Sequence, residues 1–169
     1  MKTRFLLLTA FAALFAAGCG KNDTSAPAPA AAAAAPAPAA PAGPRTVEIT
    51  ANDMMKFSLA SIEAKPGEDL KVILTNIGSA PKEAMGHNWV LLKKGTDVAT
   101  FATAAMVAKA TDYIPDALKD QVIVHTELLG PRKSGEVTFK APTEPGEYPF
   151  LCTFPAHFQV GMKGVLIVK

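Results

Sequence analysis

The amino-acid sequence predicts an all-β domain, an antiparallel sandwich of eight strands with one short helix. Short runs rich in β-branched and apolar residues recur between Pro, Gly and Asn residues from residue 46 onward. Apolar and polar side chains alternate over residues 70–75, as in a strand with one face in water. Residues 165–168 are continuously apolar instead, which indicates a strand inside a covered sheet.

The predicted elements follow one another with short breaks, except after the fourth strand segment. There a longer excursion includes an Ala-rich stretch at 101–110 that ends before Asp112 and Pro115, and this stretch predicts the single helix. The strands are expected at 46–50, 61–64, 69–76, 88–93, 122–126, 135–140, 147–152 and 164–169.

The first 18 residues have the pattern of a secretory signal peptide. A basic start at 1–4 precedes an apolar segment at 5–15 and then small residues, so we expect export. The apolar segment is short for a membrane span. Cys19 directly follows Gly18, as in the cleavage site of bacterial lipoproteins, which indicates that Cys19 becomes the lipid-modified N-terminus. Ala16 stands where that cleavage site prefers Leu.

Residues 19–44 are mostly Ala, Pro, Gly and Ser, a composition that cannot bury a varied core, so we interpret them as a linker. Residues 45–169 then have the length and composition of one globular domain. This domain contains 14 Lys and Arg against 14 Asp and Glu residues. Its neutrality gives no support for nucleic-acid binding.

The segment from Cys152 to Met162 is the most informative part of the chain, because it contains a thiol, the imidazole of His157 and a thioether. If Cys19 is lipidated, Cys152 is a lone thiol in an oxidising compartment, which calls for a metal, a partner or a reactive role. Two His, one Cys and a weak axial Met form the ligand set of blue-copper centres. His87, far upstream and just before an apolar run, supplies the second His.

Other interpretations of these residues stay open at this point. A lone Cys is often a small buried hydrophobe, Met162 is a common type of core filler, and His87 alone would be an ordinary loop residue. Zinc is disfavoured by the single Cys and the Met. A copper delivery or storage module would benefit from exposed Met or His clusters. A multicopper enzyme would need more His than His87, His125 and His157. We therefore predict an electron carrier with one copper ion, not an enzyme.

Three segments carry a resemblance to a known family. Residues 85–91 (MGHNWVL), 152–157 (CTFPAH) and 162–164 (MKG) resemble the azurins, small blue-copper proteins of the cupredoxin fold, and the likeness extends over about 46–169. The resemblance implies an eight-stranded Greek-key β-sandwich with a helix-bearing flap. The signal peptide and Ala/Pro linker are similar to those of lipid-anchored azurins.

The resemblance also implies a ligand set. His87, Cys152 and His157 would be the equatorial copper ligands, Met162 the weak axial ligand, and the carbonyl of Gly86 would approach from the opposite side. From the residues themselves we expect Asn88 to tie the two ligand segments together and the Phe154 N–H to donate to the sulfur, whereas Pro155 has no N–H to give. Trp89 is expected in the core.

The chain departs from the azurins in three places. Four residues, 158–161, separate His157 from Met162 where azurins have three, a spacing like that of auracyanin and plastocyanin. The positions near Arg45 and Gly67 are not cysteines, so the disulfide of azurins is missing. Asn76 stands where azurins carry a pH-responsive His, so no pH switch is expected.

The family resemblance gives expectations about partners and location. We expect a monomer that exchanges electrons with redox proteins such as cytochromes, reductases or peroxidases. Docking is expected on an apolar, uncharged patch around His157 and Met85, through which the His157 ring edge emerges. Lipid on Cys19 would anchor the protein in the bacterial cell envelope, at the outer membrane or facing the periplasm.

Overall fold

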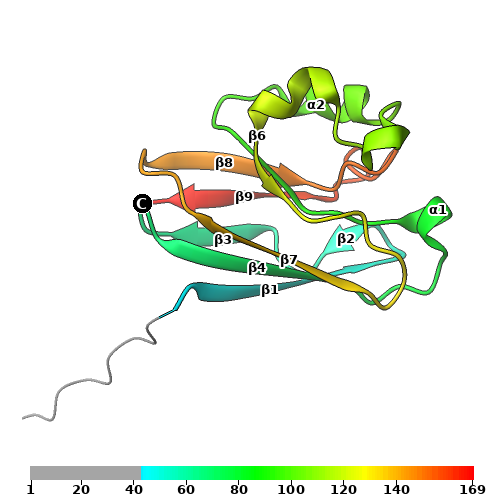
Figure 1. The fold of residues 1–169 in the computed structure, drawn as a ribbon, viewed down its shortest axis with the longest axis horizontal. Helices are drawn as coiled ribbons and strands as arrows, with labels where there is room; N and C mark the ends of the chain where they lie inside the picture. The colour runs from blue at the N-terminus through cyan, green and yellow to red at the C-terminus, as the bar shows by residue number, and fades with distance from the viewer. Residues whose placement is uncertain (1–42) are drawn as a thin grey trace, which may run out of the picture. The chain divides into compact units, whose positions relative to one another are not determined.

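Two β-sheets packed face to face form the domain, as Figure 1 shows for the computed structural model, which describes residues 43–169. The predicted signal peptide and nearly all of the predicted linker lie outside these residues. One sheet has the strand order β2-β1-β4-β7 and the other β3-β9-β8-β5-β6. The strands are β1 (Arg45–Asn52), β2 (Lys56–Phe57), β3 (Ser61–Ala64), β4 (Asp69–Asn76), β5 (Val90–Leu92), β6 (Val122–His125), β7 (Ser134–Lys140), β8 (Gly146–Leu151) and β9 (Lys163–Val168).

The expected cupredoxin-like sandwich is confirmed, with a corrected strand count. The described residues contain nine strands instead of eight, because the two-residue strand β2 pairs with the end of β1. A strand of two residues is too short to show the alternation by which strands are recognised in a sequence. The turn that makes this pairing possible has Met55 at φ 56° and the Asn52 side chain accepting from the Met54 N–H.

The expectation of a purely antiparallel sandwich was wrong. β1 runs parallel to β4, and β3 runs parallel to β9. Side-chain alternation is the same in parallel and antiparallel strands, so the sequence pattern carries no signal of direction. The parallel pairs bring the start of β1 and the end of β9 to one end of the domain. The end of β8 and the start of β9 lie at the other end (Figure 1).

The core between the sheets contains Trp89, as expected. Its ring is fully buried and lies 5.4 Å from the Phe150 ring and 6.1 Å from the Phe139 ring, measured between centroids. A second apolar cluster lies on the outer face of the five-stranded sheet, where Phe101 of helix α2 (Val98–Ala105) packs with Leu151. The flap therefore covers the strand that leads directly into Cys152 (Figure 1).

Helix α2 (Val98–Ala105) begins three residues earlier and ends five residues earlier than the predicted range of 101–110. It starts early because the Asp97 carboxylate accepts hydrogen bonds from the N–H groups of Ala99 and Thr100, an N-cap that sequence analysis missed. The other helices in the described part of the chain are a short α1 (Lys82–Met85) and two 3₁₀ turns, η1 (Lys109–Thr111) and η2 (Asp116–Gln121). Within residues 43–169 no helix is long and apolar enough to cross a membrane.

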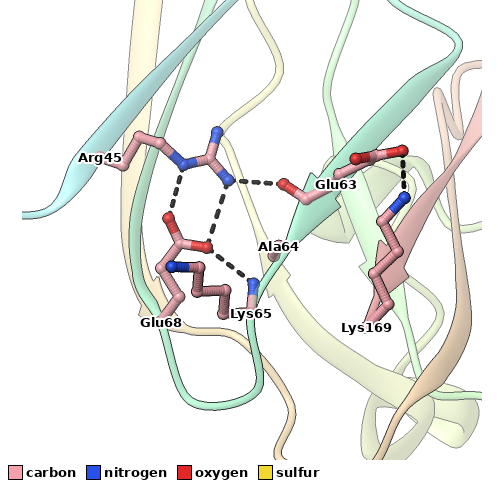
Figure 2. Close-up of a pocket in the computed structure, with 6 residues that line it drawn as sticks. All are labelled: Arg45, Glu63, Ala64, Lys65, Glu68 and Lys169. Carbon is pink, nitrogen blue, oxygen red and sulfur yellow. Dashed lines mark hydrogen bonds and ion pairs between the residues drawn. The ribbon is translucent and has the colours of Figure 1, made fainter.

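A cavity of about 490 Å³ lies where β1 begins and β9 ends. Figure 2 shows the ion pairs that line it: Arg45 binds the Glu68 carboxylate at 2.6 Å, and Lys169 binds Glu63 at 2.7 Å. The Arg45 guanidinium also donates to the Glu63 carbonyl. All of these charged side chains are partly exposed. This cavity is at the opposite end of the strands from the predicted copper ligands.

Candidate metal centre

The four side chains predicted to bind copper come from two segments at one end of the sandwich. Cys152 follows β8 directly, and the chain then turns through His157 to Met162, which precedes β9. Tight turns make this return possible, with Ala156 at φ 67° and Gly161 at φ 92°. A non-glycine residue at positive φ is strained, so Ala156 marks a loop held by its surroundings.

His87 reaches the loop from between α1 and β5. A two-residue bridge fixes its backbone, because the His87 N–H donates to the Leu129 carbonyl at 3.1 Å and the Leu129 N–H donates back at 2.8 Å. Leu129 is held in turn by the buried amide of Asn76, which donates to the same carbonyl at 3.3 Å. Asn76 thus has a positioning role that sequence analysis did not identify.

Three of the predicted ligands meet in a small buried cluster. The ligand atoms of His87, Cys152 and His157 all lie within 4.8 Å of one another. The sulfur is 3.4 Å from Nδ1 of His157 and 3.9 Å from Nδ1 of His87. The three residues are 0%, 0% and 2% exposed, and Met162, which follows Cys152 and His157 in the same loop, is also fully buried. Its N–H donates to the His157 carbonyl, and its carbonyl accepts from the Cys152 N–H.

The electrostatics of the cluster favour neutral imidazoles and a neutral thiol in the absence of a cation. Burial, followed by the nearby His87, lowers the pKa of His157 to about 4. Burial likewise lowers the pKa of His87. Burial raises the pKa of the Cys152 thiol to about 12, opposed by hydrogen bonds from the backbone of Asn88 and Phe154. Neutral imidazoles keep their lone pairs free, and a bound cation offsets the charge of the thiolate.

Asn88 connects the two ligand segments, as predicted. Its side-chain oxygen accepts from the Thr153 N–H at 2.9 Å, and its amide nitrogen donates to the Thr153 hydroxyl at 2.7 Å. The same amide nitrogen donates to the carbonyl of Asp112 at 3.3 Å, so it also holds the flap. Hydrogen bonds that orient ligands in this way keep metal-site geometry fixed.

The residue before His87 must be small. A Cβ on Gly86 would lie 2.8 Å from the Lys82 carbonyl and 3.0 Å from the Leu128 side chain, so no larger residue fits without movement.

The Nε2 atom of His87 is buried and lacks a partner of good hydrogen-bond geometry, although the backbone of Asn52 is close enough to raise the pKa of His87.

The surface above the cluster differs in part from the expected patch. His157 is only 2% exposed, so almost none of its ring emerges. Phe154 is buried against His157, with ring centroids 4.8 Å apart, and Phe158 is half-buried with the Lys163 ammonium over its ring. Ala156 is exposed and Met85 is half-buried. His125 is exposed on β6 and lies outside the cluster.

Known proteins share both the sequence and the fold. The family described as copper binding proteins, plastocyanin/azurin family, matches residues 45–169. An azurin from Pseudomonas chlororaphis is 38% identical over 127 residues, 73% of this chain and 97% of that protein. Auracyanin-B from Chloroflexus aurantiacus is 34% identical over 126 residues, 73% of this chain and 52% of that protein. The structure of reduced auracyanin from Roseiflexus castenholzii superposes with a TM-score of 0.67 at 34% identity, covering 75% and 98% of the two chains.

The chain belongs to the plastocyanin/azurin family of copper-binding proteins. It is a cupredoxin electron carrier, not an enzyme, and its type-1 copper site is formed by His87, Cys152, His157 and Met162. The buried donor set fits this metal: thiolate and thioether suit Cu(I), imidazole suits Cu(II), and the same set serves both. When bound, copper supplies a one-electron Cu(I)/Cu(II) couple.

The protein's own residues keep the rearrangement between the two states small. His87 is fixed by the Leu129 bridge, and the Cys152 loop is fixed by Asn88. Because both segments are anchored to packed strands, the donors stay in place when the charge of the site changes. The buried aromatic wall of Phe154 excludes water from the His157 side. A dry, rigid site favours fast electron exchange.

Proposed function

We propose that this protein carries single electrons in the bacterial cell envelope through a copper site with three strong ligands and two weak ones. His87, Cys152 and His157 bind strongly, the Met162 thioether binds weakly along the axis, and the Gly86 carbonyl approaches from the opposite side. The observation that supports this best is the buried cluster of one thiol and two imidazoles, whose donor atoms lie within 4.8 Å of one another.

The visible and EPR spectra of the Cu(II) protein test this ligand set. Charge transfer from the Cys152 sulfur should give an intense visible band, and Cys152→Ser should remove it, because a hydroxyl oxygen is a far poorer electron donor to copper. An intense band that survives in Cys152→Ser would show that another group binds the metal.

The axial position has its own test, because four residues separate His157 from Met162. In Met162→Leu we expect copper to remain bound and the reduction potential to rise, since loss of a weak donor disfavours Cu(II) more than Cu(I). Met54→Leu is the control and should leave the potential unchanged, because the Met54 side chain is 75% exposed, whereas Met162 is fully buried. An unchanged potential in Met162→Leu would mean that Met162 is not a ligand.

Redox partners such as cytochromes, reductases or peroxidases are proposed to dock on the apolar surface that includes Met85 and Ala156. Ala156 is exposed in the ligand loop, next to His157. The neutral domain has little net field to steer partners, so contact is brief and depends weakly on salt. Ala156→Glu or Met85→Lys should slow electron self-exchange while the copper spectrum stays the same. If these variants exchange electrons at the wild-type rate at low salt, electrons enter and leave the protein through another surface.

Anchoring through lipid on Cys19 is also proposed, with the monomeric copper domain facing the periplasm from the outer membrane or another envelope surface. The support is the sequence pattern at 1–19, which lies outside the described residues. In Cys19→Ala the processed protein should leave the membrane fraction with its copper spectrum intact, because firm attachment needs more than one acyl chain. A processed variant that stays membrane-bound would contradict the lipid anchor.

A further inference from the structure

A second hollow lies beside the copper site, between α1 and the flap. It has a volume of about 190 Å³, and its apolar walls are Tyr113, Leu128 and Phe154. An apolar cavity of about 150 Å³ is known to hold one benzene molecule, so this hollow has room for one substituted six-membered ring. Its rim is charged, with ammonium and carboxylate groups from Lys82, Glu83, Lys109 and Asp112.

One wall of the hollow is in contact with a copper ligand. The Phe154 ring meets the Tyr113 ring edge-on with centroids 5.1 Å apart, and on its other side it lies 4.8 Å from the His157 ring. The His157 Nδ1 atom is in turn 3.4 Å from the Cys152 sulfur. Electronic coupling falls steeply across gaps, so a ring seated against Phe154 is connected to the site through rings in van der Waals contact.

The flap holds this wall in an unusual backbone conformation. Asp112 and Tyr113 are consecutive non-glycine residues with φ of 49° and 65°. The Tyr113 N–H donates to the Ala108 carbonyl at 2.9 Å, and Asn88 donates to the Asp112 carbonyl at 3.3 Å. Strained residues kept in place by such contacts are concentrated at functional sites. These two hydrogen bonds hold the backbone of Tyr113, whose ring packs against Phe154.

We propose that this hollow binds a small dihydroxybenzene, of the hydroquinone class, which donates electrons to the oxidised protein through Phe154 and His157. The aromatic walls accept the flat ring, and the Glu83 and Asp112 carboxylates accept hydrogen bonds from its hydroxyl groups. The proposal rests on the electron-carrier function but adds a donor of a different class from a protein partner.

The reaction balances without another reagent. Two oxidised protein molecules each accept one electron in separate encounters, and one dihydroxybenzene loses two electrons and two protons to become the quinone. The protons pass to the rim carboxylates and then to water. One dihydroxybenzene molecule therefore reduces two protein molecules. The protein is a stoichiometric electron acceptor in this reaction and not a catalyst.

Binding can be measured without electron transfer in the Cu(I) protein, which cannot accept another electron. Titration with 1,4-dihydroxybenzene should shift the ¹H–¹⁵N NMR signals of Tyr113, Leu128 and Phe154 along a saturating curve. The signal of Ala156, on the proposed partner-docking surface, should move little. Shifts that do not saturate, or that are centred on Ala156, would overturn the proposal.

The Cu(II) protein supplies the second measurement. Its colour should fade under excess 1,4-dihydroxybenzene at a rate that saturates with donor concentration. Glu83→Gln with Asp112→Asn keeps the shape of the rim, and Asn tolerates the positive φ at 112. This double variant should need roughly two to ten times more donor for half-saturation, as expected for lost hydrogen bonds to the ligand. Glu48→Gln with Glu147→Gln removes the same two charges from β1 and β8, outside the hollow, and this charge-matched control should behave like wild type.

The wall is tested separately from the rim. Tyr113→Phe keeps the ring and should retain NMR binding, whereas Tyr113→Ala should weaken it, with an unchanged copper spectrum showing that the site is intact in both. Equal binding in Tyr113→Ala and wild type would overturn the proposal. The electron-carrier function itself fails only if the Cys152→Ser variant keeps the intense band, so the two results are distinguishable.

Discussion

The two ends of the sandwich hold their polar groups in opposite ways. At the copper end, Cys152 and His157 are at most 2% exposed, and their partners are other buried groups. At the other end, the ion pair of Glu63 and Lys169 has both side chains 63% exposed. Polar groups lose their water at the first end and keep it at the second. A change of one atom should therefore matter greatly at the copper end and little at the other.

The largest contrast is expected between two histidines. His87→Ala should eliminate the type-1 spectrum, because it removes one of three strong donors from a closed cluster. His125→Ala should leave the spectrum unchanged, since His125 is exposed and its Nδ1 atom lies 3.0 Å from the neighbouring Thr126 carbonyl, outside the copper cluster. Visible and EPR spectra of the two Cu(II) variants check this. A normal type-1 spectrum in His87→Ala would show that His87 is not a copper ligand.

Asn88→Leu should give the next largest effect, on stability. The substitution leaves the Thr153 N–H and the Asp112 carbonyl without their partner in a buried region, which should cost about 2–4 kcal/mol of unfolding free energy. Urea unfolding of the variant and wild type measures the difference. A loss below about 1 kcal/mol would mean that water or a shifted backbone satisfies these groups.

A pH-dependent contrast is expected at Asp53, whose carboxylate accepts from the Ser79 N–H at 2.8 Å, the Ser79 hydroxyl and the Ala80 N–H. The hydrogen bond from the Ser79 backbone is the main cause that lowers the pKa of Asp53 from its ordinary value of 3.8. A lowered folded-state pKa contributes stability that is fully present above 3.8 and is lost as the pH falls through the lowered value.

Asp53→Asn should therefore be less stable than wild type at pH 6, and the difference should shrink below pH 4 in urea unfolding series. Asp116→Asn is the control, because the exposed Asp116 side chain accepts no hydrogen bond from the residues at 43–169. A difference for Asp53→Asn that is constant from pH 7 to pH 3 would mean that shape and not charge is responsible.

The smallest effect is expected at the far end, in the pair of Lys169 and Glu63. A double-mutant cycle with Lys169→Met and Glu63→Gln should give a coupling of about 0.5 kcal/mol or less, falling further in 0.5 M salt, because water and ions screen exposed charges. A coupling of about 2 kcal/mol would show that this end is as tightly organised as the copper end.

The copper ligands were predictable because the chemistry of a lone thiol, an imidazole and a thioether in one short segment has few explanations. The second ligand, His87, was a candidate because it precedes an apolar run, and family resemblance was needed to favour it over an ordinary loop histidine. Trp89 in the core and Asn88 between the ligand segments were also predicted and are confirmed. At these positions the chemistry of the side chain restricts the possible role to a few alternatives.

The features that sequence analysis missed depend on contacts between residues that are distant in the sequence. Whether β1 and β3 run parallel or antiparallel depends on the strands with which they pair. The alternation of apolar and polar residues carries no information about this pairing. The role of Asn76 arises from a contact with Leu129, 53 residues away. The near-complete burial of His157 follows from the Phe154 ring turning inward, although the His157 ring edge was predicted to emerge through an apolar patch. A turn signal identifies a loop but does not say which of its side chains face the core.

The placement of three ligands between residues 152 and 162 also affects how copper stabilises the fold. An unfolded chain keeps this short segment intact, so it retains a thiol, an imidazole and a thioether that bind copper without the sandwich. A ligand raises the stability of a protein only by its preference for the folded over the unfolded form. Here that preference comes from the fourth ligand, His87, and from the burial of the site, both of which only the folded protein provides. The melting temperature should therefore rise less on copper loading than the affinity of the folded site alone would give.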